Sequence, residues 1–205
     1  MDKLTIEYVS EIDKNAIAAF NNHPGRRPEH RLQTRVGPFL PTANIRTAPV
    51  VMLLANPGYS DDLAETPDGC EAFTAQGWPF GHIHPDAPQG AREWTRKRLR
   101  VLIEQFGDHF IANNLACVQL IPWASVQFHE GARLPSRDLI LQEVKSAGER
   151  GALLVVMRIA RLWKPEIQNA KVIQAKNPRS PYMSPGNLKD FDLVVQTLQN
   201  KSRLV

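Results

Sequence analysis

Four short apolar runs constrain the fold of this chain more than any other feature of its sequence. They cover residues 49–55, 115–121, 152–157 and 171–175. The first three contain few polar residues and show no alternation, a pattern typical of strands that are covered on both faces, as parallel sheets require. Helical patterns separate the runs. The sequence therefore predicts an α/β fold in three layers, α/β/α, with a central, mostly parallel four-stranded sheet.

Apolar periodicity and end signals predict the helices between these runs. The expected helices cover residues 91–106, 137–149 and 187–200, with a helical turn over 160–164. In the first of them Trp94, Leu99 and Phe106 share one face, and arginines surround the other. Ser136 is a suitable N-cap for the second, and Gly151 is a suitable residue to end it.

The N-terminal part of the chain predicts less regular structure. We expect a short strand and a helix within residues 1–20, and residues 1–48 form an irregular N-terminal arm because prolines and glycines are frequent after residue 20. Residues 59–90 are polar and rich in glycine and proline, and a loop of that length in a compact domain usually has a function. At 205 residues the chain is expected to form one domain, 1–205, around one core.

Composition excludes several classes of protein. The sequence has no apolar run of about 18 residues, so no membrane partner is expected. The N-terminus lacks the pattern of a secretory signal, and the two cysteines, Cys70 and Cys117, have no paired spacing, which favours the reducing cytoplasm. The formal charge of +4 is compatible with nucleic acid as a partner without requiring it.

The carboxyl ends of the predicted strands are where a ligand is expected, because parallel α/β sheets bind ligands outside those ends. The residues found there are Asn56-Pro57-Gly58, Gln119 to Trp123, Arg158, and Lys176-Asn177-Pro178. Gly58 permits a positive φ, which predicts a sharp turn after the first strand. The guanidinium of Arg158 can fill the cleft or bind a phosphate.

These motifs carry a family resemblance. Leu53-Leu54-Ala55-Asn56-Pro57-Gly58 resembles the first motif of the uracil-DNA glycosylase superfamily, in the branches with Asn-Pro-Gly, and the chain is also similar to bacterial uracil-DNA glycosylase-like proteins. Gln76 to Gly81 resembles the loop that brings an aromatic ring onto a flipped base, and Asn177-Pro178-Arg179-Ser180-Pro181 resembles the closing motif. Two residues depart from the family pattern: Gln119 stands where an asparagine is usual, and Arg179 separates Pro178 from Ser180.

The resemblance implies a hydrolase that cleaves the N-glycosidic bond of a modified or mismatched base in DNA, with DNA as the partner and no metal or cofactor. The base is first extruded from the stack. Asn56 would position a water and Asn177 would stabilise the departing base, as the catalytic pair. The resemblance also implies a base-binding set and a DNA-contact set. The first is Pro57, Gly58, Tyr59, Phe80 and Gln119, and the second is Ser180, Tyr182, Met183, Ser184 and Gly186.

Other interpretations stay open. The departures at Gln119 and Arg179 favour a catalytically silent nucleobase- or nucleic-acid-binding protein of the same fold, or an enzyme that acts on free nucleotides. His82 and His84 have a spacing seen in metal sites, but without a third ligand nearby they are more typical of a loop surface. A glycosidase pair among Asp61, Asp62 and Glu65 is possible in principle, although clustered acids in a loop are usually solvated.

Overall fold

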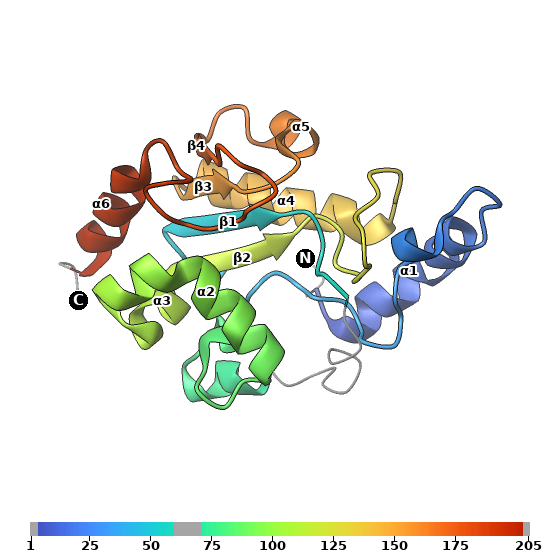
Figure 1. The fold of residues 1–205 in the computed structure, drawn as a ribbon, viewed down its shortest axis with the longest axis horizontal. Helices are drawn as coiled ribbons and strands as arrows, with labels where there is room; N and C mark the ends of the chain where they lie inside the picture. The colour runs from blue at the N-terminus through green and yellow to red at the C-terminus, as the bar shows by residue number, and fades with distance from the viewer. Residues whose placement is uncertain (1–3, 60–70, 203–205) are drawn as a thin grey trace.

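A central sheet with helices on both faces forms the computed structural model, which describes residues 4–59 and 71–202 (Figure 1). The strands are β1 (Val50–Leu54), β2 (Leu115–Gln119), β3 (Leu153–Val156) and β4 (Lys171–Gln174). The helices are α1 (Ile6–Asn21), α2 (Gln89–Phe106), α3 (Asp108–Asn114), α4 (Pro135–Glu149), α5 (Ala160–Trp163) and α6 (Phe191–Ser202). Within these described residues, none of the helices combines the length and the apolar character needed to cross a membrane.

The sheet is parallel throughout, in the order β2-β1-β3-β4. Val50 lies opposite both Leu115 and Leu153, and Leu153 lies opposite Lys171, so the four strands begin in line. Their carboxyl ends therefore meet at one edge of the sheet. Each strand lies within one of the apolar runs, and the predicted α/β fold is confirmed.

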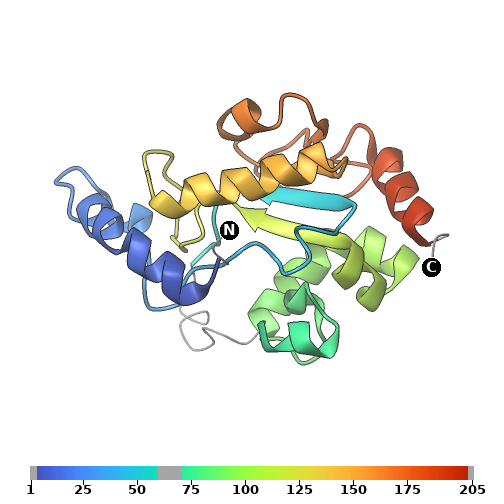
Figure 2. The ribbon, with the colours of Figure 1, turned by 180° about the vertical axis from the view of Figure 1, so that it is seen from behind.

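Alternate residues of the central strand supply two separate apolar cores. Val50, Met52 and Leu54 pack with α2, α3 and α6 on one side of the sheet, which we call the α2 face. Val51 and Leu53 pack with α4 and α5 on the other side, the α4 face. Figure 2 shows α4 lying across the sheet from behind. Since both faces are covered, a continuous apolar run was the right signal for β1.

Helix α4 begins differently from the prediction. Its first residue is Pro135, and the residue before it, Leu134, makes no side-chain cap. Proline is well suited to this first position, since its missing N–H would have no helical partner there. Ser136 is not the N-cap but lies inside the first turn, where its backbone N–H donates to the Asp13 carboxylate at 2.9 Å.

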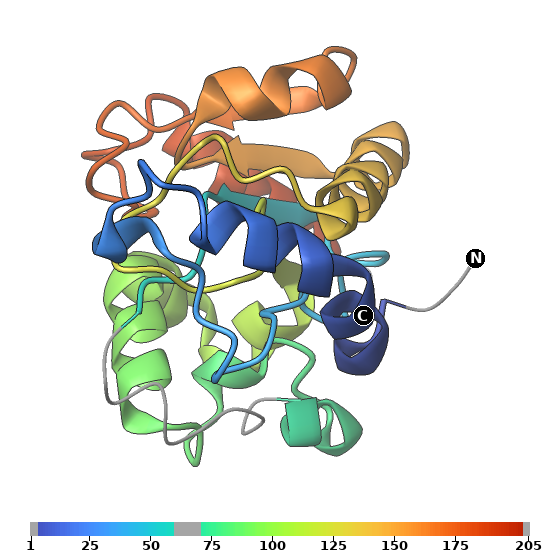
Figure 3. The same cartoon turned by 90° about the vertical axis from the view of Figure 1, so that its right-hand side faces the viewer.

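The N-terminal arm contains the expected helix, whereas the described residues 4–20 form no strand. Ile6–Asn21 form a 16-residue helix, α1, whose N-cap Thr5 accepts a hydrogen bond from Tyr8. This helix lies beyond the carboxyl ends of the strands (Figures 1 and 3). It is held there by Asp13, which is fully buried and accepts hydrogen bonds from Trp123 Nε1 at 2.7 Å and from the Ser136 hydroxyl.

The rest of the arm runs along the free side of β2. The Phe39 N–H donates to the Pro122 carbonyl at 2.7 Å, and the Thr42 N–H donates to the Cys117 carbonyl at 3.1 Å. Earlier in the arm, the Gln33 N–H donates to the Ala124 carbonyl, which lies beyond the end of β2. An uncovered edge strand invites pairing with other chains, so the arm protects the sheet where β2 would otherwise be exposed.

Candidate functional site at the carboxyl edge of the sheet

At one point of the carboxyl edge, the chain leaves two neighbouring strands toward opposite faces of the sheet. The chain leaves β1 toward α2 on the α2 face, whereas it leaves the adjacent β3 toward α5 on the α4 face. Open α/β sheets bind ligands at such a reversal, because the diverging loops leave a crevice between them. Asn56 and Arg158 each follow their strand by two residues and so flank this point.

Asn56 is held with a defined amide orientation. The residue is 9 % exposed, and its Nδ2 donates to Ser125 Oγ at 2.8 Å and to the Pro57 carbonyl at 3.0 Å. The Ser125 hydroxyl donates its own proton to the Gln127 carbonyl, so its oxygen acts as the acceptor for Asn56. These partners distinguish the nitrogen from the oxygen. Oδ1 of Asn56 remains as an acceptor that no described residue occupies with a hydrogen bond.

The segment after Asn56 does not turn at Gly58, and the predicted positive φ is wrong. Gly58 is absent from the glycines with positive φ and instead forms a parallel bridge with Ser125. The Ser125 N–H donates to Pro57, and the Tyr59 N–H donates to Ser125, so the chain continues extended. A Cβ at Gly58 would meet no described atom within 4 Å. Neither conformation nor packing explains the glycine, which fits close approach of a ligand to its backbone.

Gln119 ends β2 with an unpaired acceptor. Its Oε1 is buried, and no described group donates to it. The strand alternation places Gln119 on the same side of β2 as Cys117, on the α2 face. An unpaired buried acceptor costs about 1–3 kcal/mol relative to a paired one. A ligand N–H placed there would remove this cost, so Gln119 can contribute an acceptor to recognition.

The loop after β4 holds Asn177 in the complementary orientation. Asn177 is exposed, and its Oδ1 accepts the Arg179 N–H at 3.0 Å, which leaves its Nδ2 as a donor directed away from that bond. Asn187 ties the loop together, because its Oδ1 accepts the Asn177 N–H and its Nδ2 donates to Ser180 and Tyr182. β4 lies two strands from β1, so the strands that precede Asn56 and Asn177 are about 10 Å apart in the sheet.

The residues expected to contact DNA differ in their access to solvent. Gly186 is exposed, and Ser180, Tyr182 and Ser184 are half-buried. Met183 is fully buried within the core on the α2 face and does not reach the surface. Its burial follows from its backbone N–H, which donates to the Arg98 carbonyl on α2 and draws the loop inward.

Phe80, expected to stack on a base, also belongs to the core. The ring is 2 % exposed in the cluster on the α2 face, and its backbone N–H donates to Ala112 at 3.2 Å. The structure therefore brings Asn56, Gln119 and Asn177 to one edge but leaves the face of Phe80 covered by other side chains.

Comparisons with protein-family models, with curated proteins and with solved structures found no match.

Three residues of this edge carried no recognisable signal in the sequence. Ser125 orients Asn56, Asn187 ties the loop after β4, and Arg98 reaches that loop from α2. Ser125 and Arg98 act through partners distant in the chain, and Asn187 acts through residues of its own loop. A single asparagine, serine or arginine in a polar segment has no pattern that could reveal such a partner.

The histidines near Phe80 pack against aromatic rings. His82 stacks on Phe39 with centroids 6.3 Å apart, and burial lowers the pKa of His82 to about 4. His84 stacks on Phe73 at 3.9 Å. Within residues 4–59 and 71–202, no three His, Cys, Asp or Glu side chains are grouped to hold a metal ion. Burial raises the pKa of the Cys117 thiol to about 12, which keeps it protonated.

Asp61, Asp62 and Glu65, considered above as a glycosidase pair, lie outside the described residues, as does Cys70.

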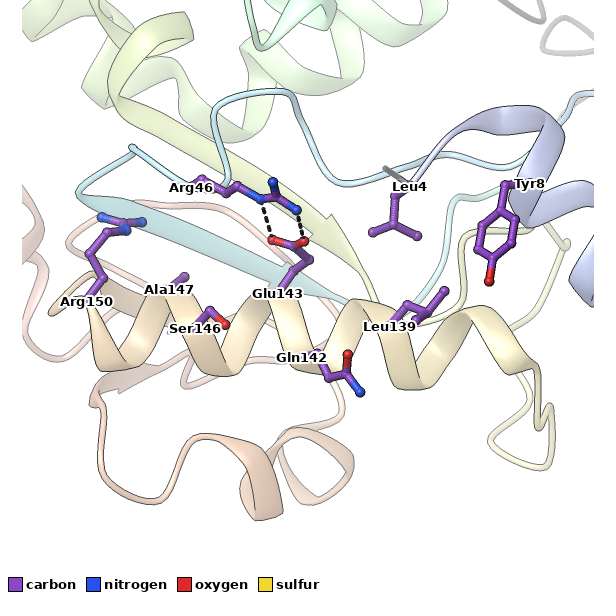
Figure 4. Close-up of a pocket in the computed structure, with 9 residues that line it drawn as sticks. All are labelled: Leu4, Tyr8, Arg46, Leu139, Gln142, Glu143, Ser146, Ala147 and Arg150. Atoms are coloured by element: carbon purple, nitrogen blue, oxygen red, sulfur yellow. Dashed lines mark hydrogen bonds and ion pairs between the residues drawn. The ribbon is translucent and has the colours of Figure 1, made fainter. Parts of the chain in front are cut away.

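A separate groove lies between α1 and α4 (Figure 4). Its volume is about 410 Å³, and Leu4 and Tyr8 face Leu139 across it. Arg46 closes one side through a two-pronged ion pair with Glu143, which raises the pKa of the Arg46 guanidinium. None of the predicted site residues lines this groove.

Proposed function

We propose that this protein is a uracil-DNA glycosylase-like hydrolase of the cytoplasm that cleaves the N-glycosidic bond of a modified or mismatched base in DNA. One observation carries the proposal. Two asparagine amides at the same sheet edge are fixed in opposite orientations, so that Asn56 offers an acceptor and Asn177 offers a donor. Hydrolysis of this bond needs both: an acceptor to hold the attacking water and a donor to stabilise the departing base.

The chemistry follows from these groups. A neutral amide cannot act as a strong base, so Asn56 Oδ1 would orient a water toward the anomeric carbon of the sugar. The water oxygen would bond to the anomeric carbon as the N-glycosidic bond breaks, and the base would leave with the electrons of that bond. Asn177 Nδ2 would donate to the resulting anion, and the proton lost by the water would pass to the base or to solvent. Removing one such donor typically lowers kcat by about 10²–10³-fold. The unpaired Oε1 of Gln119 would accept an N–H of the base and so select it.

The spacing of the edge agrees with a nucleoside as the bound group. Two strands about 10 Å apart, with the end of β3 between them, match the length of a sugar and base laid along the edge. The backbone at Gly58, which no described side chain covers, would lie along one side of the ligand. Because the base must leave the DNA stack to reach this edge, single-stranded or mismatched DNA would bind at the lowest cost.

A specific observation favours a second candidate, a nucleobase- or nucleic-acid-binding protein without turnover. Phe80 and Met183, the side chains expected to stack on the base and to contact the DNA, are 2 % and 0 % exposed. A binding protein that recognises a base by the edge groups alone would need neither. The same applies to an enzyme acting on free nucleotides.

Cleavage of a panel of oligonucleotides tests the proposal. The strands carry uracil, hypoxanthine or a thymine mismatch, and alkali-labile sites are counted after incubation with the protein. We expect cleavage of at least one substrate and its loss in Asn56→Ala. Asn114→Ala is the matched control, because Asn114 precedes β2 at the opposite edge of the sheet and should retain the wild-type rate. Salt-sensitive binding of every strand without cleavage of any would reject the hydrolase in favour of the binding protein.

A further inference from the structure

One arginine of α2 differs from the others. Arg96 pairs with Asp108 at 2.6 Å and Arg100 with Glu104 at 3.5 Å, both on the outside of the helix. The Arg98 guanidinium instead lies over the ring of Trp94, with its Cζ 4.2 Å from the centroid, and 5.6 Å from the centroid of Tyr182. Its Nε is buried without a hydrogen-bond partner. Arg98 therefore keeps an unsatisfied donor where the other two arginines are neutralised.

Arg158 approaches the same loop from the end of β3. Its Nε donates to the Pro178 carbonyl at 3.0 Å, which fixes the plane of the guanidinium. The two terminal nitrogens form no hydrogen bond or ion pair with the described residues. Arginine matches phosphate oxygens best through such a fork of parallel donors.

The backbone beside Arg158 is strained in a way that supports a function. Ile159 has φ 51° and ψ 40°, the left-handed conformation, and is the one non-glycine residue with positive φ within the described chain. A β-branched side chain rarely adopts this conformation, and such outliers gather at functional sites. The strain lies next to the reversal point of the sheet and turns the chain from Arg158 into α5.

Both arginines contact the same loop: the Arg98 guanidinium lies by Tyr182, and Arg158 Nε donates to Pro178. Arg98 accepts the Met183 N–H at its carbonyl, and Arg158 holds Pro178, so both contact one loop, 175–188. Burial lowers the pKa of Arg98, and the positive charge of Arg158 lowers it further. Neither pairs with a carboxylate of the described residues, and the loop itself contains Lys176 and Arg179 but no acid.

We propose that Arg98 and Arg158 form a binding site for a phosphate group, next to the edge that holds Asn56 and Asn177. A phosphate would supply the negative charge that these two arginines of one loop lack and would accept hydrogen bonds from the Arg158 fork. Tyr182 lies against Arg98, and its ring would border the bound group. The site would accept the phosphate of a nucleotide or of a nucleic-acid strand. It deepens the proposed function by naming a phosphate-bearing substrate, but phosphate binding does not require turnover.

Calorimetric titration tests the site directly. The probes are inorganic phosphate, 2′-deoxyuridine 5′-monophosphate, unphosphorylated 2′-deoxyuridine and a short oligothymidylate. We expect Arg158→Gln and Arg98→Gln each to weaken binding of the phosphate-bearing probes by about tenfold or more, and to leave binding of 2′-deoxyuridine unchanged. Arg100→Gln, two residues from Arg98 on the outside of α2, is the matched control and should match the wild type. Arg158→Lys keeps the charge and removes the fork of parallel donors, and circular dichroism verifies that each variant folds.

The arms of the titration separate the two sources of phosphate. Tighter binding of the monophosphate identifies a free nucleotide. Tighter binding of the oligothymidylate, with a salt slope that falls by about one in Arg158→Gln, identifies a nucleic-acid backbone. Either result supports the site. Equal binding of 2′-deoxyuridine and its monophosphate, or wild-type affinity in both folded glutamine variants, would overturn it.

Cleavage of the oligonucleotide panel by the same preparations keeps the two proposals apart. Phosphate binding that depends on Arg158 in a protein without glycosylase activity leaves the site standing and rejects the hydrolase. Cleavage that neither arginine substitution changes leaves the hydrolase standing and rejects the phosphate site.

Discussion

The two asparagines of the sheet edge are held in opposite ways. Asn56 is almost buried, and its amide nitrogen is surrounded by oxygens from a segment almost 70 residues further along the chain, including Ser125. Asn177 is exposed, and its amide is held by the N–H of Arg179, two residues away. The first orientation depends on tertiary packing, whereas the second depends on a local turn. Changes around Asn56 should therefore affect stability and function together, and changes at Asn177 should affect function alone.

The largest effect is expected on the side of Asn56, where tertiary packing holds the chain. The test removes Asp13, which anchors α1 to Trp123 and Ser136 on that side. Asp13→Ala would leave Trp123 Nε1 and both donors of Ser136 unpaired in the core. We expect the free energy of unfolding to fall by about 3–4 kcal/mol, measured by urea denaturation. Glu11→Ala, an exposed acid on the same helix, is the control and should change it by less than about 0.5 kcal/mol. A similarly small effect of Asp13→Ala would show that this side does not depend on the buried network.

A pH titration of stability tests the N-terminal arm that runs along β2, where Phe39 stacks on His82. The pKa of His82 is about 4 in the folded chain, below its ordinary 6.5, so between these values the unfolded chain binds a proton that the folded chain does not. The stability contributed by neutral His82 is present in full above pH 6.5 and is lost as the pH falls toward 4, by up to about 3 kcal/mol. His82→Gln should have a shallower loss over this range, whereas His23→Gln, an exposed control, should keep the wild-type slope.

Ser125→Ala should produce a smaller effect that joins stability to function. The change removes the acceptor for Asn56 Nδ2 and the donor to Gln127, at a cost of about 1–2 kcal/mol in the free energy of unfolding. Activity or base binding should fall further than stability explains, because the Asn56 amide loses the contact that orients it. Ser184→Ala, in the loop of Asn177, provides the comparison on the other side. Full activity in a destabilised Ser125→Ala would argue against a role for the amide orientation.

Asn177→Ala should have the smallest effect on stability and a large effect on turnover. Its exposed side chain caps one turn, so the free energy of unfolding should change by less than about 0.5 kcal/mol. If Asn177 donates to the departing base, kcat should fall by about a hundredfold with little change in KM. A large loss of stability would show that the loop, like the region of Asn56, is part of the core.

The contrast also explains which features could be predicted from the sequence. β1 was predictable because both faces of the sheet are covered, and Val50 to Leu54 are apolar throughout. The role of Arg98 was not, although Trp94 lies one helical turn before it and receives its guanidinium. Its contact with the loop after β4, folded back onto α2, has no signal in the local sequence.

The wrong predictions at Gly58 and Ser136 have one physical origin, pairing with a partner distant in the chain. Gly58 permits a turn, but pairing with Ser125, 67 positions away, keeps the chain extended. Ser136 has the chemistry of an N-cap, yet Asp13 from α1 binds it inside the first turn of α4. Local preferences were predicted correctly where no distant partner competed with them and wrongly where one did.

The most direct measurement is a crystal structure of the protein soaked with free bases: uracil, thymine and hypoxanthine. The account predicts electron density for a base between the loops of Asn56 and Asn177, with Gln119 Oε1 accepting a base N–H and Asn177 Nδ2 donating to a base oxygen or nitrogen. A base bound instead in the groove between α1 and α4, or an empty edge at concentrations that saturate binding in solution, would contradict it.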